Sequence, residues 1–121
     1  MTHIKDPSSY TWVNIEQEII GLGPASPIKV IEVVGKRLCV AWWNGNVFAF
    51  AFKCPHAGGI LADGYLDMEG NIVCPIHRYK YSLENGYNTS GEGYYLSIYP
   101  VDRREGGLYI GLEKKGFWGF L

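Results

Sequence analysis

Short apolar segments, each ended by a turn sequence, recur along most of the chain. Within several of these segments apolar and polar residues alternate, which is the pattern of a strand with one buried face. No helical pattern separates the segments, as parallel βαβ units would require. The predicted strands are residues 10–15, 28–34, 37–43, 47–52, 72–73, 79–82, 96–101 and 108–112.

The turn sequences between these segments favour hairpins. Asn44-Gly45 separates two predicted strands, and Asn-Gly is a strong hairpin signal because both residues tolerate positive φ. Further turns are predicted at residues 35–36, 84–86 and 105–107, whereas residues 16–22 hint at a helix that is too short to matter much. With 16 glycines and many short strands, the chain is predicted to form an all-β sandwich or barrel.

The composition excludes several classes of protein. A length of 121 residues with 47% hydrophobic residues suits one compact domain, expected to span residues 1–121. A formal net charge of −1 lacks the positive excess that nucleic-acid binding requires. The apolar runs are far shorter than the roughly 20 residues of a membrane span. The first residues lack a basic segment followed by an apolar one, so a cytoplasmic location is expected.

Residues 53–91 have less strand pattern and hold two sequence boxes of metal-ligand type. Cys54 and His56 stand in the first box, and Cys74 and His77 stand in the second, after 17 intervening residues. Three cysteines are an odd number, which argues against a disulfide framework. The spacing allows two Pro- and Gly-rich loops to converge, each donating one thiolate and one imidazole to a metal centre.

The two boxes, C-x-H and C-x-x-H in CPHAG and CPxH contexts, resemble the motif of Rieske [2Fe-2S] proteins. The similarity extends over residues 10–112 and implies an antiparallel β sandwich or barrel that carries one [2Fe-2S] cluster per chain. In this family Cys54 and Cys74 would bind one iron, and His56 and His77 the other, partly solvent-exposed iron. A cluster-binding subdomain is then expected at about residues 53–91, on a β base of about residues 10–52 and 92–112.

Other interpretations of the cysteines and histidines are open. Four paired ligands could form a structural Cys2His2 zinc site, although the chain has enough apolar strand to fold without metal. Cys39 lies in an apolar predicted strand and is expected to be a small buried core residue. His3 lies near the N-terminus with no candidate partner nearby and is expected to be solvated.

The resemblance also has departures. High-potential Rieske proteins add a cysteine to each box to form a disulfide, and Gly59 and Ile76 stand at those positions here. Tyr79 replaces a serine that donates a hydrogen bond to a bridging sulfide, whereas Tyr81 is placed to donate to a cysteine sulfur. Fewer donors predict a reduction potential toward the lower end of the Rieske range. Arg78, where many relatives have glycine, either recognises an acidic partner or is a solvated loop charge.

These features predict an electron-transfer protein rather than an enzyme. The expected function is that of a monomeric Rieske ferredoxin that receives single electrons from a flavin-dependent reductase and passes them to a terminal oxygenase or another oxidoreductase. The alternative is a Rieske-like small subunit of a larger oxidoreductase such as NAD(P)H-dependent nitrite reductase. The apolar residues 116–121 either cap an open end of the β base or offer a docking patch to a partner.

Overall fold

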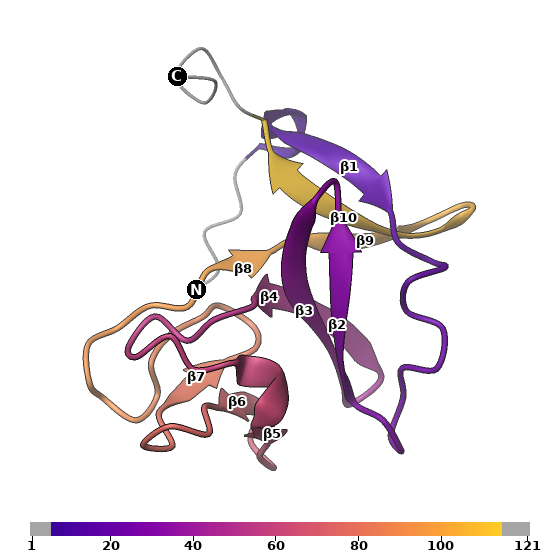
Figure 1. Ribbon diagram of the computed structural model, residues 1–121. Helices are drawn as coiled ribbons and strands as arrows, with labels where there is room; N and C mark the ends of the chain where they lie inside the picture. The colour runs from indigo at the N-terminus through magenta and orange to yellow at the C-terminus, as the bar shows by residue number, and fades with distance from the viewer. Residues whose placement is uncertain (1–5, 115–121) are drawn as a thin grey trace.

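The computed structural model describes residues 6–114 and confirms an all-β fold made of three antiparallel sheets. The sheets have the strand orders β1-β10-β9, β2-β3-β4-β8 and β5-β6-β7 (Figure 1). No helix in this part of the chain is both long and apolar enough to span a membrane. The elements are η1 (Pro7–Ser9), β1 (Tyr10–Asn14), β2 (Ile28–Val33), β3 (Lys36–Trp43), β4 (Asn46–Ala51), η2 (Leu61–Asp63), β5 (Tyr65–Leu66), β6 (Asn71–Val73), β7 (Lys80–Ser82), β8 (Ile98–Tyr99), β9 (Val101–Arg104) and β10 (Gly107–Glu113).

Two hairpins join β2, β3 and β4 into the centre of the molecule. The predicted turn at Asn44-Gly45 is confirmed, with φ of 53° and 84° at the two residues. The register places Cys39 opposite Val30 on one side and opposite Phe50 on the other. The hairpins therefore hold β3 between two neighbours that satisfy its backbone hydrogen bonds.

Strands β3 and β4 are buried on both faces, and each face contributes to a different core. In β3, Leu38 and Val40 face one core, whereas Cys39 and Ala41 face the other. This explains why the strand is a continuous apolar run and does not alternate with polar residues. The base core comprises Ile15, Ile31, Val33, Leu38, Val40, Ala49, Leu108 and Ile110. The loop-side core comprises Cys39, Ala41, Phe50, Cys54, Leu61, Ile72, Cys74, Tyr81, Leu83 and Leu96.

The small sheet β5-β6-β7 lies away from β1, β9 and β10, beside η2 (Figure 1). Its strands are only two or three residues long, and β6 is buried along its whole length. Asn71 at the start of β6 is a buried polar residue, and its side-chain amide donates to Asp67 Oδ2 at 2.9 Å. Short strands of this kind gain little from pairing alone, so packing against the loop-side core stabilises the sheet.

Several predicted elements differ from those observed. Residues 16–22 form turns and no helix, with Ile15 accepting at its carbonyl from the amides of Glu18 and Ile19. The predicted strand 96–101 is split, because Pro100 lies between β8 and β9, which pair in different sheets. Proline has no N–H to donate, so it suits this change of sheet. The strand pair that includes β5 was absent from the prediction because two residues carry no readable alternation.

Candidate metal centre

Two loops carry the four residues of the sequence boxes, and both are closed by backbone hydrogen bonds of the same kind. The amide of Cys54 donates to the carbonyl of Gly59 at 2.7 Å, and the amide of Cys74 donates to the carbonyl of Tyr79 at 2.8 Å. The second loop begins directly after β6 and ends directly before β7, so the small sheet fixes both of its ends. The two boxes thus fold into matching turns, as their similar spacing predicts.

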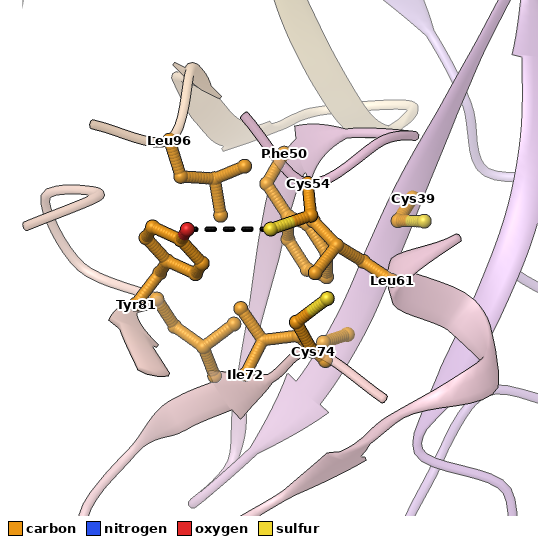
Figure 2. Close-up of a cluster of buried hydrophobic side chains, with 10 residues drawn as sticks. Cys39, Phe50, Cys54, Leu61, Ile72, Cys74, Tyr81 and Leu96 are labelled. Carbon is orange, nitrogen blue, oxygen red and sulfur yellow. Dashed lines mark hydrogen bonds between the residues drawn. The ribbon is translucent and has the colours of Figure 1, made fainter. Parts of the chain in front are cut away.

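The thiols of Cys54 and Cys74 are buried side by side in the loop-side core. Cys54 is 3% exposed and Cys74 0% exposed, and the two side chains interact with each other. Figure 2 shows the Tyr81 hydroxyl directed at the Cys54 sulfur, at an O–S distance of 3.2 Å. Burial raises the pKa of the free Cys74 thiol, and the neighbouring Cys54 raises it further. A bound metal ion would remove this cost by replacing the thiol protons.

Burial also raises the pKa of the Tyr81 hydroxyl, which therefore keeps its proton over the whole physiological range. A metal-bound thiolate has no proton to give, so Tyr81 is the donor whenever Cys54 is a ligand. The hydrogen bond expected from the sequence is thus present in the structure, with Tyr81 fully buried in β7.

The imidazoles of His56 and His77 lie next to each other at the outer end of the loops. Their ring centroids are 5.4 Å apart, with an angle of 69° between the planes. Nδ1 of His56 is buried and has no hydrogen-bond partner in the described part of the chain. A buried, unpaired ring nitrogen costs about 1–3 kcal/mol, and a metal ion is the type of partner that would satisfy it. His77 is exposed and has a left-handed backbone, with φ of 62°.

The donor set suits a binuclear iron–sulfur cluster. Two thiols are buried together, and two imidazoles lie together nearer to solvent, so the ligands come in pairs of one chemical kind. Within residues 6–114 no group of three or more His, Cys, Asp and Glu side chains is placed to hold a single metal ion. A [2Fe-2S] cluster would take two protein ligands at each iron, and the two thiols and two imidazoles could supply them.

Gly59 in the first loop lies against Ile76 and Cys74 in the second loop. A Cβ atom on Gly59 would lie 2.9 Å from Cδ1 of Ile76 and 3.0 Å from Sγ of Cys74. Any side chain at position 59 would therefore displace the second loop or the Cys74 sulfur. The two positions at which high-potential Rieske proteins carry a disulfide are thus neighbours here, and they are joined by apolar contact.

Two tyrosines enclose His56, and this role was not predicted from the sequence for either of them. Tyr79 stacks on the His56 ring with centroids 4.2 Å apart and planes 27° apart. Tyr94 lies against the same ring at 5.1 Å, from a loop that follows the second box. No spacing rule connects residue 94 to the boxes, so this contact became visible only in the folded chain. Tyr79, which was noted only as a replacement for serine, is part of the wall around a candidate ligand.

The remaining candidate residues fall outside this centre. Cys39 is 0% exposed, which confirms it as a core residue, and burial raises its pKa to about 12. Arg78 is exposed, and its backbone is left-handed, with φ of 57°, a conformation that favours glycine. His3 and residues 116–121 lie outside the described residues, so the expectations for them stay untested.

The chain matches a known protein family and individual known proteins. The family described as the Rieske [2Fe-2S] domain matches residues 17–93, which include both boxes. The ferredoxin component of the alkene monooxygenase system of Xanthobacter autotrophicus (strain ATCC BAA-1158 / Py2) is 29% identical over 84 residues, which are 69% of each protein.

Two solved structures share the fold. The ferredoxin of carbazole 1,9a-dioxygenase from Nocardioides aromaticivorans IC177 has a TM-score of 0.66 at 23% identity, over 88% of this chain and 99% of that one. A Mycobacterium tuberculosis protein described as an NADH-dependent nitrite reductase small subunit has a TM-score of 0.71 at 17% identity, over 87% of this chain and 97% of that one. At these sequence identities the two structures show a shared fold and nothing about function.

Proposed function

Because the chain belongs to the family of Rieske [2Fe-2S] domains, we propose that it is a ferredoxin, a protein that carries single electrons and catalyses no reaction of its own. The observation that supports this most directly is the pairing of two buried thiols with two imidazoles near the surface. A bound [2Fe-2S] cluster supplies reversible one-electron chemistry at such a site. The family match also makes a structural zinc site the weaker interpretation of the same residues.

The ligands in this proposal are Cys54 and Cys74 for one iron and His56 and His77 for the other. Nδ1 of His56 has no hydrogen-bond partner among residues 6–114, which supports the assignment, since such an imidazole nitrogen is available to bind metal. Residues 53–91 then form the cluster-binding part of one domain, and residues 10–52 and 92–112 form the base that supports it. His77 is exposed, so its ring offers a route for electrons from this site to a docked protein.

The partners in this proposal are other redox proteins. A flavin-dependent reductase would donate the electron, and a terminal oxygenase would accept it. The Xanthobacter relative, a ferredoxin component of a monooxygenase system, supports an oxygenase as the acceptor. Arg78 beside His77 is exposed and could pair with a carboxylate of either partner. A permanent subunit of a nitrite reductase is the second candidate, but its support is a likeness of fold at 17% identity.

Purification with iron, sulfide and zinc analysis tests the proposal. We expect two irons and two sulfides per chain, no stoichiometric zinc, and a rhombic EPR signal that appears only after reduction. The iron-loaded protein should be monomeric in sedimentation, and it should restore electron flow from a flavin-dependent reductase to a Rieske oxygenase. Stoichiometric zinc without iron, or an iron signal typical of four cysteine ligands, would contradict the assignment.

A further inference from the structure

Asn88 is a buried side-chain amide that binds the loop following the second box. It is 4% exposed, and a buried amide costs free energy unless its hydrogen bonds are made. The two N–H groups of its Nδ2 share three acceptors, the carbonyl of Lys80 at 2.9 Å, Ser90 Oγ at 3.1 Å and Glu92 Oε1 at 3.0 Å. Its Oδ1 accepts from the amide of Tyr94 at 3.2 Å. One side chain thus connects β7 to the loop that contains Glu92 and Tyr94.

The loop is fixed further from its other side. The amide of Lys80 donates to Ser90 Oγ at 2.9 Å, and the amide of Thr89 donates to the carbonyl of Lys80 at 3.0 Å. Lys80 directly follows Tyr79, which stacks on His56. Both tyrosines that enclose His56 are therefore held by the same set of hydrogen bonds around Lys80 and Asn88.

Glu92 carries a negative charge close to this wall. Hydrogen bonds from Ser90 and Asn88 lower the pKa of its carboxyl. The same carboxylate contributes to the raised pKa of the Tyr79 hydroxyl, after the larger contribution of burial. The carboxylate is thus ionised at neutral pH and exposed to solvent. It is bonded to the Asn88 side chain, which also binds the amide of Tyr94, and the Tyr94 ring lies against His56.

We propose that Asn88 is a positioning residue that holds Tyr94 and Glu92 against the His56 side of the metal centre and thereby lowers the reduction potential. This inference rests on the proposed [2Fe-2S] site, to which it adds three residues outside the two boxes. Neither Asn88, Glu92 nor Tyr94 would touch the irons. They act through the surroundings of His56.

The sign of the effect follows from the charges. Two ferric ions, two sulfides and two thiolates sum to zero, so one added electron makes the reduced centre an anion. The Tyr94 ring lies against the His56 ring and so covers part of it from water, and loss of water disfavours the charged form. The Glu92 carboxylate disfavours the same form by repulsion. Both residues therefore oppose reduction, and Asn88 is needed to hold each of them in place.

Reduction potentials of three variants of the iron-loaded protein test the inference. Glu92→Gln should raise the equilibrium constant for reduction about two- to tenfold, where tenfold is about 59 mV for one electron. Tyr94→Ala should raise it by a similar factor. Asn88→Ala should raise it at least as much as either, and should speed hydrogen exchange of the Tyr94 amide. Salt near 1 M screens charges beyond about 3 Å, so it should reduce the effect of Glu92→Gln on the potential. It should leave the effect of Tyr94→Ala unchanged, because that effect does not depend on a charge.

Two matched controls separate this role from general perturbation. Glu69→Gln removes an exposed carboxylate from the turn before β6, and Tyr87→Ala removes a ring that is 62% exposed. Both controls should leave the potential unchanged. Glu92 and Tyr94 are exposed, so their variants are expected to fold and decide the question even if Asn88→Ala does not accumulate.

The outcomes distinguish this inference from the proposed function. If the wild-type protein gives the rhombic EPR signal but Glu92→Gln and Tyr94→Ala have the wild-type potential, only the inference about Asn88 is overturned, and the proposed function stands. Shifts of equal size in the two controls would also overturn it, because the effect would then not depend on position. A wild-type protein without that signal would overturn the proposed function and this inference together.

Discussion

The base core and the loop-side core lie on opposite faces of the same two strands, yet they are built from different side chains. The base core is entirely aliphatic. The loop-side core mixes aliphatic residues with three cysteines, a phenylalanine and the Tyr81 hydroxyl bonded to Cys54. One face of β3 and β4 therefore only buries apolar surface. The other face also forms part of the surroundings of the Cys54 and Cys74 sulfurs.

This difference predicts which property a substitution changes. Aliphatic packing stabilises the folded chain in proportion to the apolar surface that it buries. A hydrogen bond to a sulfur, or a charge near an imidazole, acts on the difference between two redox states and so changes the potential. Substitutions in the base core should therefore change stability alone, and polar substitutions around the loops should change the potential more than stability.

The largest expected effect concerns the three buried cysteines. Cys54→Ser or Cys74→Ser should abolish the iron–sulfur cluster, because serine is a poor replacement for a thiolate ligand to ferric iron. Cys39→Ala removes a thiol from the same core and should leave the iron content unchanged. Iron analysis and visible absorption of the three purified variants measure this. Loss of iron in a folded Cys39→Ala protein would contradict the ligand assignment.

The next effect is on stability, from the base core. Ile110 is 0% exposed, so Ile110→Ala should lower the free energy of unfolding by about 2–5 kcal/mol through lost burial and a cavity. The reduction potential should stay at the wild-type value. Guanidinium unfolding followed by tryptophan fluorescence, beside voltammetry of the same samples, checks both expectations. Ile20→Ala is the control, because Ile20 is 65% exposed and should tolerate the change.

The sequence predicts the base well because its hairpins follow local rules. The Asn44-Gly45 turn fixes the β3–β4 register, and the alternation of neighbouring strands is visible in a single segment. The strand ends were predicted to within one or two residues where no proline intervened. Pro100 broke the predicted strand 96–101 into β8 and β9, which belong to different sheets, and alternation carries no information on sheet membership.

Only the part of the candidate site that lies in or directly beside the two boxes was predictable from the sequence. The boxes predicted the matched loops, and the Tyr81 hydrogen bond followed from the family resemblance. The wall around His56 could not be predicted, since Tyr94 reaches it through a loop whose path depends on the buried Asn88. An asparagine in a polar segment gives no sign in the sequence that it will be buried.

Tyr81→Phe is expected to have a smaller effect, of opposite sign to that of the Asn88 variants. The hydroxyl donates to Cys54, and such a bond favours the electron-rich reduced state, so its loss should lower the potential. A differential of about 1 kcal/mol corresponds to a few tens of millivolts, since about 59 mV is a tenfold change for one electron. Tyr87→Phe, at an exposed tyrosine, is the control. An unchanged midpoint in Tyr81→Phe would mean that Tyr81 only packs.

The smallest expected effect compares the two hairpin turns of the base. Val34 and Gly35 have φ of 50° and 78°, nearly the values of Asn44 and Gly45 in the other turn, 53° and 84°. Asparagine tolerates this left-handed conformation, whereas a β-branched residue is rarely found in it. Val34 is also 78% exposed, so its side chain recovers little of the cost by burial.

Val34→Asn should therefore stabilise the chain by about 1 kcal/mol, the order of the penalty for a left-handed residue with a Cβ atom. Asn44→Val should destabilise it by a similar amount, because it places a β-branched residue in the same conformation. Thermal unfolding measures the change in stability of both variants. Neither variant should change the reduction potential if the base affects stability alone. A potential that shifted with Val34→Asn would show that the base hairpin also controls the surroundings of the metal centre, and the division between the two faces of β3 and β4 would then be wrong.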